Sequence, residues 1–68
     1  MNIELNGRPT KLPDGATVAD AIKELGVHGE SRGVAVAVDG EVVRRLEWGQ
    51  TTLETDQTVE VVRAVQGG

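Results

Sequence analysis

The chain ends in two glycines, Gly67 and Gly68, and we expect the terminal carboxylate of Gly68 to be its chemically active group. Glycine has no side chain to obstruct a narrow slot in a partner enzyme, and ordering it costs more entropy than ordering any other residue. A terminal carboxyl group has a pKa of about 3.3–3.7, so it is ionised at neutral pH and able to attack the α-phosphate of ATP. The alternative interpretation is a frayed end made of small residues.

The side chains show no spacing typical of a catalytic or metal site. The sequence has no cysteine, which excludes thiolate nucleophiles and thiolate metal ligands. His28 is the only histidine, and without a second ligand of its kind we interpret it as an exposed loop residue. Gly26, Gly29 and Gly33 follow a helix that we expect at Val18–Leu25, whereas the glycines of a phosphate-binding loop precede a helix. We therefore predict no catalytic residue, no metal site and no bound cofactor.

Length and composition narrow the class of protein further. A chain of 68 residues forms one domain and has no room for the enclosed cleft of an independent enzyme. Eleven acidic and seven basic residues give a net charge of −4, and Trp48 is the only aromatic residue, so we predict no nucleic-acid partner. The lack of cysteine, of an apolar leader and of a membrane-length apolar run predicts a cytoplasmic protein with no membrane partner.

Apolar periodicity predicts the elements that position the tail. Alternation indicates a strand at 1–6, and Asn6-Gly7 predicts a tight hairpin turn into a short edge strand at Thr10–Leu12, which follows a proline. Val34–Val38 is apolar on both faces, which predicts a strand that is covered on both sides or placed centrally. Asp39-Gly40 predicts a hairpin turn into a strand at Glu41–Val43, and the last strand is expected at Thr58–Ala64.

One segment, Val18–Leu25, has apolar residues at the i, i+3, i+4 and i+7 positions of a helix. Thr17 and Asp20 form the pattern of a capping box at its start, and Gly26 stands at its end. We expect the helix to pack closely on the small alanines that alternate along Val34–Val38. The order of elements predicts an α+β fold in which one helix covers one face of a four- or five-stranded sheet.

The second half of the chain closely resembles the sulfur carrier (ThiS) family of thiamin biosynthesis, whose members are ubiquitin-like β-grasp proteins. The resemblance is most specific in Val34–Val43, in Arg45–Trp48 and in Val59–Gly68, and it extends over the whole chain in length and element order. It implies a mixed sheet in which the first and last strands pair in parallel at the centre. It also implies a β-grasp domain at 1–64 followed by a flexible tail at 65–68.

The resemblance implies a mechanism as well. An adenylating enzyme of the ThiF type would use ATP and magnesium to form an acyl-adenylate on Gly68. Sulfur that originates from cysteine, brought by a sulfur donor protein, would displace AMP and leave a thiocarboxylate. A thiazole synthase of the ThiG type would then take this sulfur into the thiazole ring.

The residues before Gly68 are assigned to recognition. We expect Gly67, Gln66 and Val65 to lie in the partner's slot, where they extend the carboxylate away from the folded domain and Gly67 has no side chain to obstruct its entry. We expect partners to dock on the sheet face away from the helix, and the possible contact residues on the last strand are Val62, Arg63 and Ala64.

Three alternatives stay open. The small subunit of molybdopterin synthase shares the fold, the tail and the chemistry, although that family is usually longer and richer in aromatic residues. A ubiquitin-like modifier would be joined to lysines of other proteins. A non-catalytic β-grasp binding module would have no tail chemistry at all.

Overall fold

The computed structural model of the protein describes residues 1–26 and 33–63. Its elements are β1 (Asn2–Leu5), β2 (Arg8–Lys11), α1 (Val18–Glu24), β3 (Val34–Val38), β4 (Glu41–Val43), the 3-10 turn η1 (Arg45–Glu47) and β5 (Thr58–Arg63). Within these two segments, no helix is long and apolar enough to cross a membrane.

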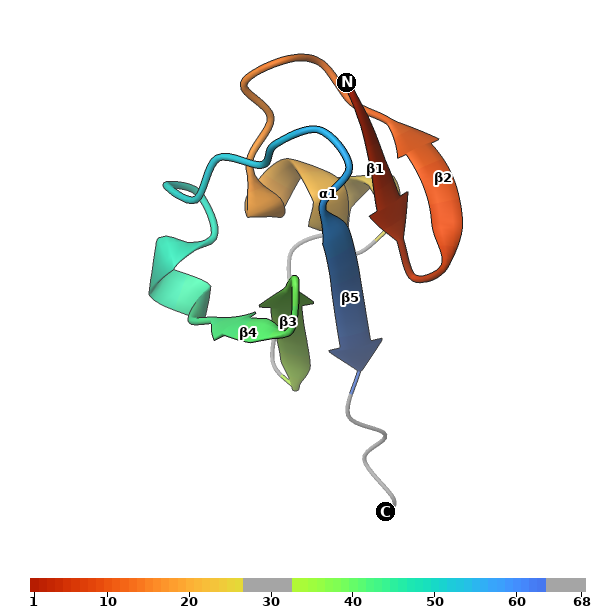
Figure 1. Ribbon diagram of the computed structural model, residues 1–68. Helices are drawn as coiled ribbons and strands as arrows, with labels where there is room; N and C mark the ends of the chain where they lie inside the picture. The colour runs from red at the N-terminus through yellow and green to blue at the C-terminus, as the bar shows by residue number, and fades with distance from the viewer. Residues whose placement is uncertain (27–32, 64–68) are drawn as a thin grey trace.

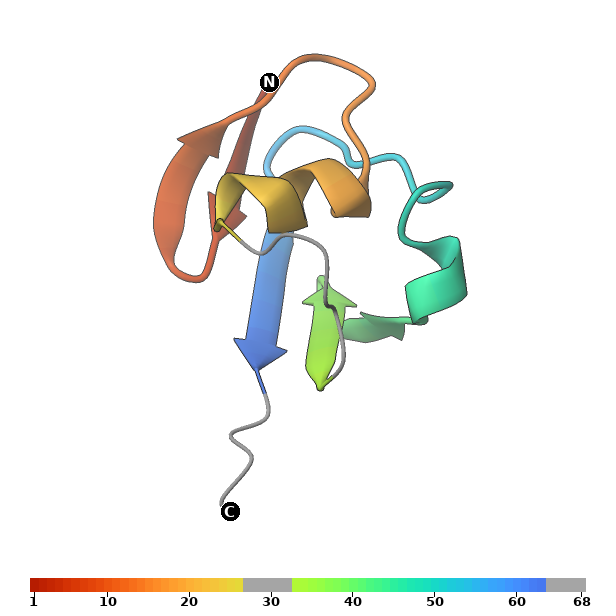
Figure 2. The same ribbon diagram turned by 180° about the vertical axis from the view of Figure 1, so that it is seen from behind.

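The strands form one five-stranded sheet in the order β2-β1-β5-β3-β4. The central strand β5 runs parallel to β1 and antiparallel to β3, and α1 crosses one face of the sheet (Figures 1 and 2). This confirms the expected α+β fold with its mixed sheet and single helix. The strand β2 lies at the edge as expected, and it includes Pro9 because the missing N–H of a proline costs no ladder hydrogen bond on an open edge.

The core lies between α1 and the valine face of the sheet. Val36 and Val38 of β3 are buried, whereas Ala35 is exposed and Ala37 is half-buried on the other face. The expectation that the helix packs on the alanines was therefore wrong. Because β-branched side chains bury more apolar area than a methyl group does, burial of the valine face is more favourable.

The helix α1 begins with the predicted capping box. The backbone N–H of Thr17 donates to the Asp20 carboxylate at 2.9 Å, and the backbone N–H of Asp20 donates to the Thr17 hydroxyl at 3.4 Å. The first of these hydrogen bonds lowers the pKa of the Asp20 carboxyl below its ordinary value, because it stabilises the ionised form. The last helical residue is Glu24, with Leu25 as the C-cap, one residue earlier than expected.

The long connection between β4 and β5 fastens the start of the helix to the rest of the fold. The N–H groups of Val18 and Ala19, which have no partner inside the helix, donate to the carbonyls of Thr51 and Trp48, each at 3.0 Å. The indole of Trp48 is buried in the core, and its Nε1–H donates to the Val43 carbonyl at 2.9 Å. Trp48 thus closes one end of the core.

Candidate functional site

The strand β5 carries the chain toward the candidate reacting group. It is hydrogen-bonded on both sides, and Arg63 at its end pairs with Val34 of β3. The backbone of β1 pairs with β5 only at Thr58 and Val59, whereas β3 pairs with it as far as Arg63, where the described part of the chain ends. The predicted tail residues Ala64, Val65, Gln66, Gly67 and Gly68 lie outside the described residues, as does His28.

The face of the sheet away from α1 carries exposed apolar side chains. Val62 of β5 pairs with Ala35 and is 62% exposed to solvent. Ala37 pairs with Val42, which is 76% exposed. These four residues, Ala35, Ala37, Val42 and Val62, constitute the open-face patch. The patch borders the end of β5, so a protein that docked there would lie next to the start of the tail.

The two described residues of the predicted partner surface lie on different faces. Side chains alternate along a strand, so Arg63 follows Val61 onto the helix side of the sheet while Val62 lies on the open side. Arg63 is exposed, and together with Asn6, Leu25 and Val61 it lines a shallow hollow of about 240 Å³. A flat docking surface that contains Val62 therefore does not include Arg63.

Two turn residues that the sequence marked only as parts of hairpin turns also hold β5. The Asn6 amide forms two hydrogen bonds with the backbone of Val61, in which Nδ2–H donates to the carbonyl at 3.2 Å and Oδ1 accepts from the N–H at 2.7 Å. The Asp39 carboxylate accepts from the N–H of Thr58 at 2.9 Å. Both residues directly precede a glycine and have a left-handed backbone, with φ of 51° and 49°. The turn dipeptides were visible in the sequence, but the long-range partners were not.

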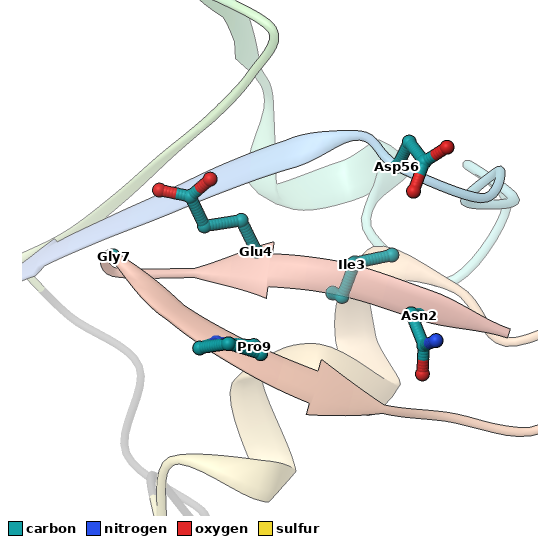
Figure 3. Close-up of a pocket in the computed structure, with 6 residues that line it drawn as sticks. All are labelled: Asn2, Ile3, Glu4, Gly7, Pro9 and Asp56. Atoms are coloured by element: carbon teal, nitrogen blue, oxygen red, sulfur yellow. The ribbon is translucent and has the colours of Figure 1, made fainter.

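A second hollow, of about 350 Å³, lies over β1 and β2 (Figure 3). Its polar side chains are the amide of Asn2 and the carboxylate of Glu4, both on β1, and the carboxylate of Asp56 from the connection before β5. Among the described residues no group of three or more histidine, cysteine, aspartate or glutamate side chains is placed to hold a metal ion.

The sequence model described as the ThiS family matches residues 2–68. The chain belongs to the ThiS family. It is 41% identical over 64 residues to the sulfur carrier protein ThiS of Thermus thermophilus, a match that covers 94% of this chain and 95% of that one. It is also 37% identical over all of its 68 residues to a thiazole synthase of Magnetococcus marinus, of which it spans 20% of the length.

Solved structures agree with the family assignment. The crystal structure of the thiamine biosynthesis protein ThiS from Geobacter metallireducens superposes with a TM-score of 0.79 at 28% identity, and the match covers the whole of both chains. A solution structure of a thiamine biosynthesis protein from the same organism gives a TM-score of 0.78 at 28% identity, covering this chain fully and 88% of the other. The ThiS resemblance and the β-grasp fold expected from the sequence are both confirmed.

Proposed function

We propose that this ThiS-family sulfur carrier of thiamin biosynthesis holds its sulfur on the main chain, as a thiocarboxylate of Gly68. The observation that carries the proposal is the family match, which runs from residue 2 through Gly67 and Gly68. The absence of cysteine supports it, because no side chain of the carrier competes for the sulfur. In this proposal the domain at 1–64 is the part that enzymes hold, and 65–68 is the part that reacts.

The proposed chemistry has two steps, both performed by partner enzymes. The Gly68 carboxylate attacks the α-phosphate of ATP, and pyrophosphate leaves. A sulfur nucleophile then attacks the carbonyl carbon of the mixed anhydride, and AMP leaves with the electron pair of the broken C–O bond. ATP and magnesium belong to the adenylating enzyme, so the carrier itself is a co-substrate that needs no bound cofactor.

Three partners follow from this chemistry: a ThiF-type adenylating enzyme, a sulfur donor protein and a thiazole synthase of the ThiG type. The thiazole synthase has the most direct support. A protein with that name in Magnetococcus marinus contains a segment similar to the whole of this chain, within a polypeptide about five times as long. A carrier-like segment joined to a synthase is consistent with a direct encounter between the two. We place these encounters in the cytoplasm.

We further propose that the open-face patch is the surface on which these enzymes dock. Val42 and Val62 are the exposed apolar residues of its strands, and burying them would release water from two β-branched side chains. The patch ends at β5, which leads into the tail, so one docking event holds the body of the carrier and presents the tail together. The proposed tail contacts are Val65, Gln66 and Gly67.

Deletion of Gly68 tests the proposal in a strain that lacks its own carrier. The full-length chain is expected to restore growth without thiazole, and the chain without Gly68 is expected to fail although it folds normally. If the shortened chain also restored growth, the protein would act as a binding module without tail chemistry. If deletion of the carrier caused a loss of molybdenum-enzyme activity and no requirement for thiazole, the molybdopterin alternative would hold. If the carrier were found stably joined to lysines of other proteins, it would be a ubiquitin-like modifier.

A further inference from the structure

We propose that Asn6 is a positioning residue for the tail, because its amide fixes the backbone of β5 two residues before β5 ends. This inference rests on the proposed function, in which the tail must deliver the Gly68 carboxylate to an enzyme. The residue itself lies far from the tail in sequence, in the turn between β1 and β2. Figure 1 shows that this turn lies at the end of the sheet from which β5 continues toward the C-terminus.

The Asn6 side chain continues a hydrogen-bond ladder that the backbone of β1 cannot continue. Along the parallel pair, the N–H of Glu4 donates to the carbonyl of Gln57 and the N–H of Asn6 donates to the carbonyl of Val59, each at 2.9 Å. After Asn6 the chain turns into β2 and leaves β5. The amide of Asn6 then supplies one donor and one acceptor to Val61, at 3.2 and 2.7 Å, as a further strand residue would.

The requirements of the turn do not explain both hydrogen bonds. Asn6 has φ of 51°, a conformation that asparagine tolerates and glycine adopts freely. A glycine would therefore satisfy the turn and keep the backbone hydrogen bond to the Val59 carbonyl, but it would not hold Val61. The two bonds to Val61 join positions 55 residues apart and use both polar atoms of the amide. They constitute an additional function of the side chain.

The turn between β3 and β4 offers an internal comparison. Asp39 has φ of 49°, precedes a glycine, and accepts hydrogen bonds from the N–H of Thr58 at 2.9 Å and from Nε2 of Gln57 at 3.3 Å. Asp39 thus holds the beginning of β5 in the way that Asn6 holds its end. The two residues have similar local roles, but only Asn6 lies next to the start of the tail.

Loss of the Asn6 amide removes one of the two restraints on the end of β5. In the described part of the chain, β5 beyond Val61 is paired with β3 alone, through the pairs Ala35–Val62 and Val34–Arg63. A strand held from one side has more freedom to twist, and that freedom spreads the directions in which the tail starts. Misorientation of a reacting group lowers the rate of a bound complex more than it weakens binding. The effect should therefore appear in kcat.

The experiment measures pyrophosphate release by a ThiF-type adenylating enzyme at varied concentrations of carrier. Asn6→Gly keeps the left-handed turn and removes the amide, and Asp39→Gly is the matched control at the other end of β5. We expect Asn6→Gly to lower kcat by about fivefold to tenfold with KM within twofold of the original value, the size of effect that one or two hydrogen bonds produce. We expect Asp39→Gly to leave kcat unchanged.

The outcomes separate this inference from the proposed function. If the original chain supports no pyrophosphate release, the proposed function fails. If the original chain is adenylated and Asn6→Gly retains its kcat, or if Asp39→Gly lowers kcat equally, the positioning role is refuted. A purely structural role for Asn6 would lower the folded fraction, which raises the apparent KM while kcat at saturation stays the same, and this result would also overturn the inference.

A second variant tests which atom of the amide matters. Asn6→Asp keeps the acceptor for the Val61 N–H but places an oxygen against the Val61 carbonyl, which accepted a hydrogen bond at 3.2 Å. We expect its kcat to lie between those of the original chain and Asn6→Gly. A kcat equal to that of the original chain would show that the donor contributes nothing.

Discussion

Replacement of Val62 by aspartate tests the docking role of the open-face patch. Val62 lies on the central strand, next to the start of the tail, and 62% of its surface is exposed. Its side chain contributes little to the core, so a change there should act on partner binding more than on the fold. Aspartate also brings a second carboxylate onto this face beside Glu60, which pairs with Ala37, and an apolar surface of the partner could not pair that charge.

The expected magnitude follows from the area that Val62 still has available. Full burial of a valine side chain is worth about 1.5–3 kcal/mol, and the 62% that is exposed corresponds to about 0.9–1.9 kcal/mol at the interface. Loss of that contact alone raises Kd by about fivefold to twentyfold. Desolvation of the new carboxylate adds to this loss, so we expect an increase in Kd of more than about tenfold for Val62→Asp.

The assay is calorimetric titration of the carrier into a ThiF-type adenylating enzyme, with circular dichroism of each variant to verify folding. Val62→Thr is the matched control, because threonine keeps the branched shape and the strand preference without adding a charge. We expect its Kd to lie between those of the original chain and of Val62→Asp. A folded Val62→Asp variant that bound within twofold of the original chain would refute the docking surface.

Three further predictions concern the fold that supports the tail. Leu5→Ala should lower the free energy of unfolding by about 2–5 kcal/mol in urea denaturation, because Leu5 is 2% exposed in a small core; a loss below ~1 kcal/mol would show that the site collapses freely. Trp48→Phe should lower the free energy of unfolding by about 1–3 kcal/mol, measured in the same way, because the partly buried Val43 carbonyl loses its Nε1–H donor; an unchanged midpoint would contradict this. Asp20→Asn should reduce the loss of stability in acid: the folded-state pKa of Asp20 is lowered, so its contribution is present above the unfolded pKa and disappears as the pH falls below about 4. Thermal unfolding between pH 6 and pH 2 checks this, and an identical pH dependence for the two chains would refute it.

The arrangement of the elements could be predicted from the sequence where local patterns determine it. Thr17 and Asp20 hydrogen-bond with each other at the start of their own helix, so predicting the capping box needed no knowledge of the rest of the fold. Asn6 and Asp39 each precede a glycine, and the left-handed conformation follows from that pair. The element boundaries were accordingly right to within one or two residues.

Features that depend on tertiary contacts were harder to predict. The strand Val34–Val38 has apolar residues on both faces, so its pattern does not say which face is buried, and the alanine face was chosen wrongly. The bonds from Asn6 to Val61 and from Asp39 to Thr58 depend on which strands are neighbours in the sheet. Val42 joined the open-face patch for the same reason, because its pairing with Ala37 places it there.

The candidate site was predicted from chemistry by exclusion and from the family resemblance. With no cysteine and a single histidine, few side chains were left to react, and the glycine end became the candidate. The structure adds how β5 is held, by Asn6 near its end and by β1 and β3 on its two sides. The role of Gly68 itself stays a prediction.

Intact-mass spectrometry of the carrier tests whether Gly68 receives sulfur. The chain is incubated with a ThiF-type adenylating enzyme, magnesium, ATP and sulfide. Its intact mass is then measured, and the chain is fragmented in the mass spectrometer to locate any change. We predict that the mass rises by the difference between one sulfur and one oxygen atom, with the change located on Gly68 and dependent on ATP. An unchanged mass while the enzyme remains active on a proven carrier, or a sulfur located elsewhere in the chain, would contradict it.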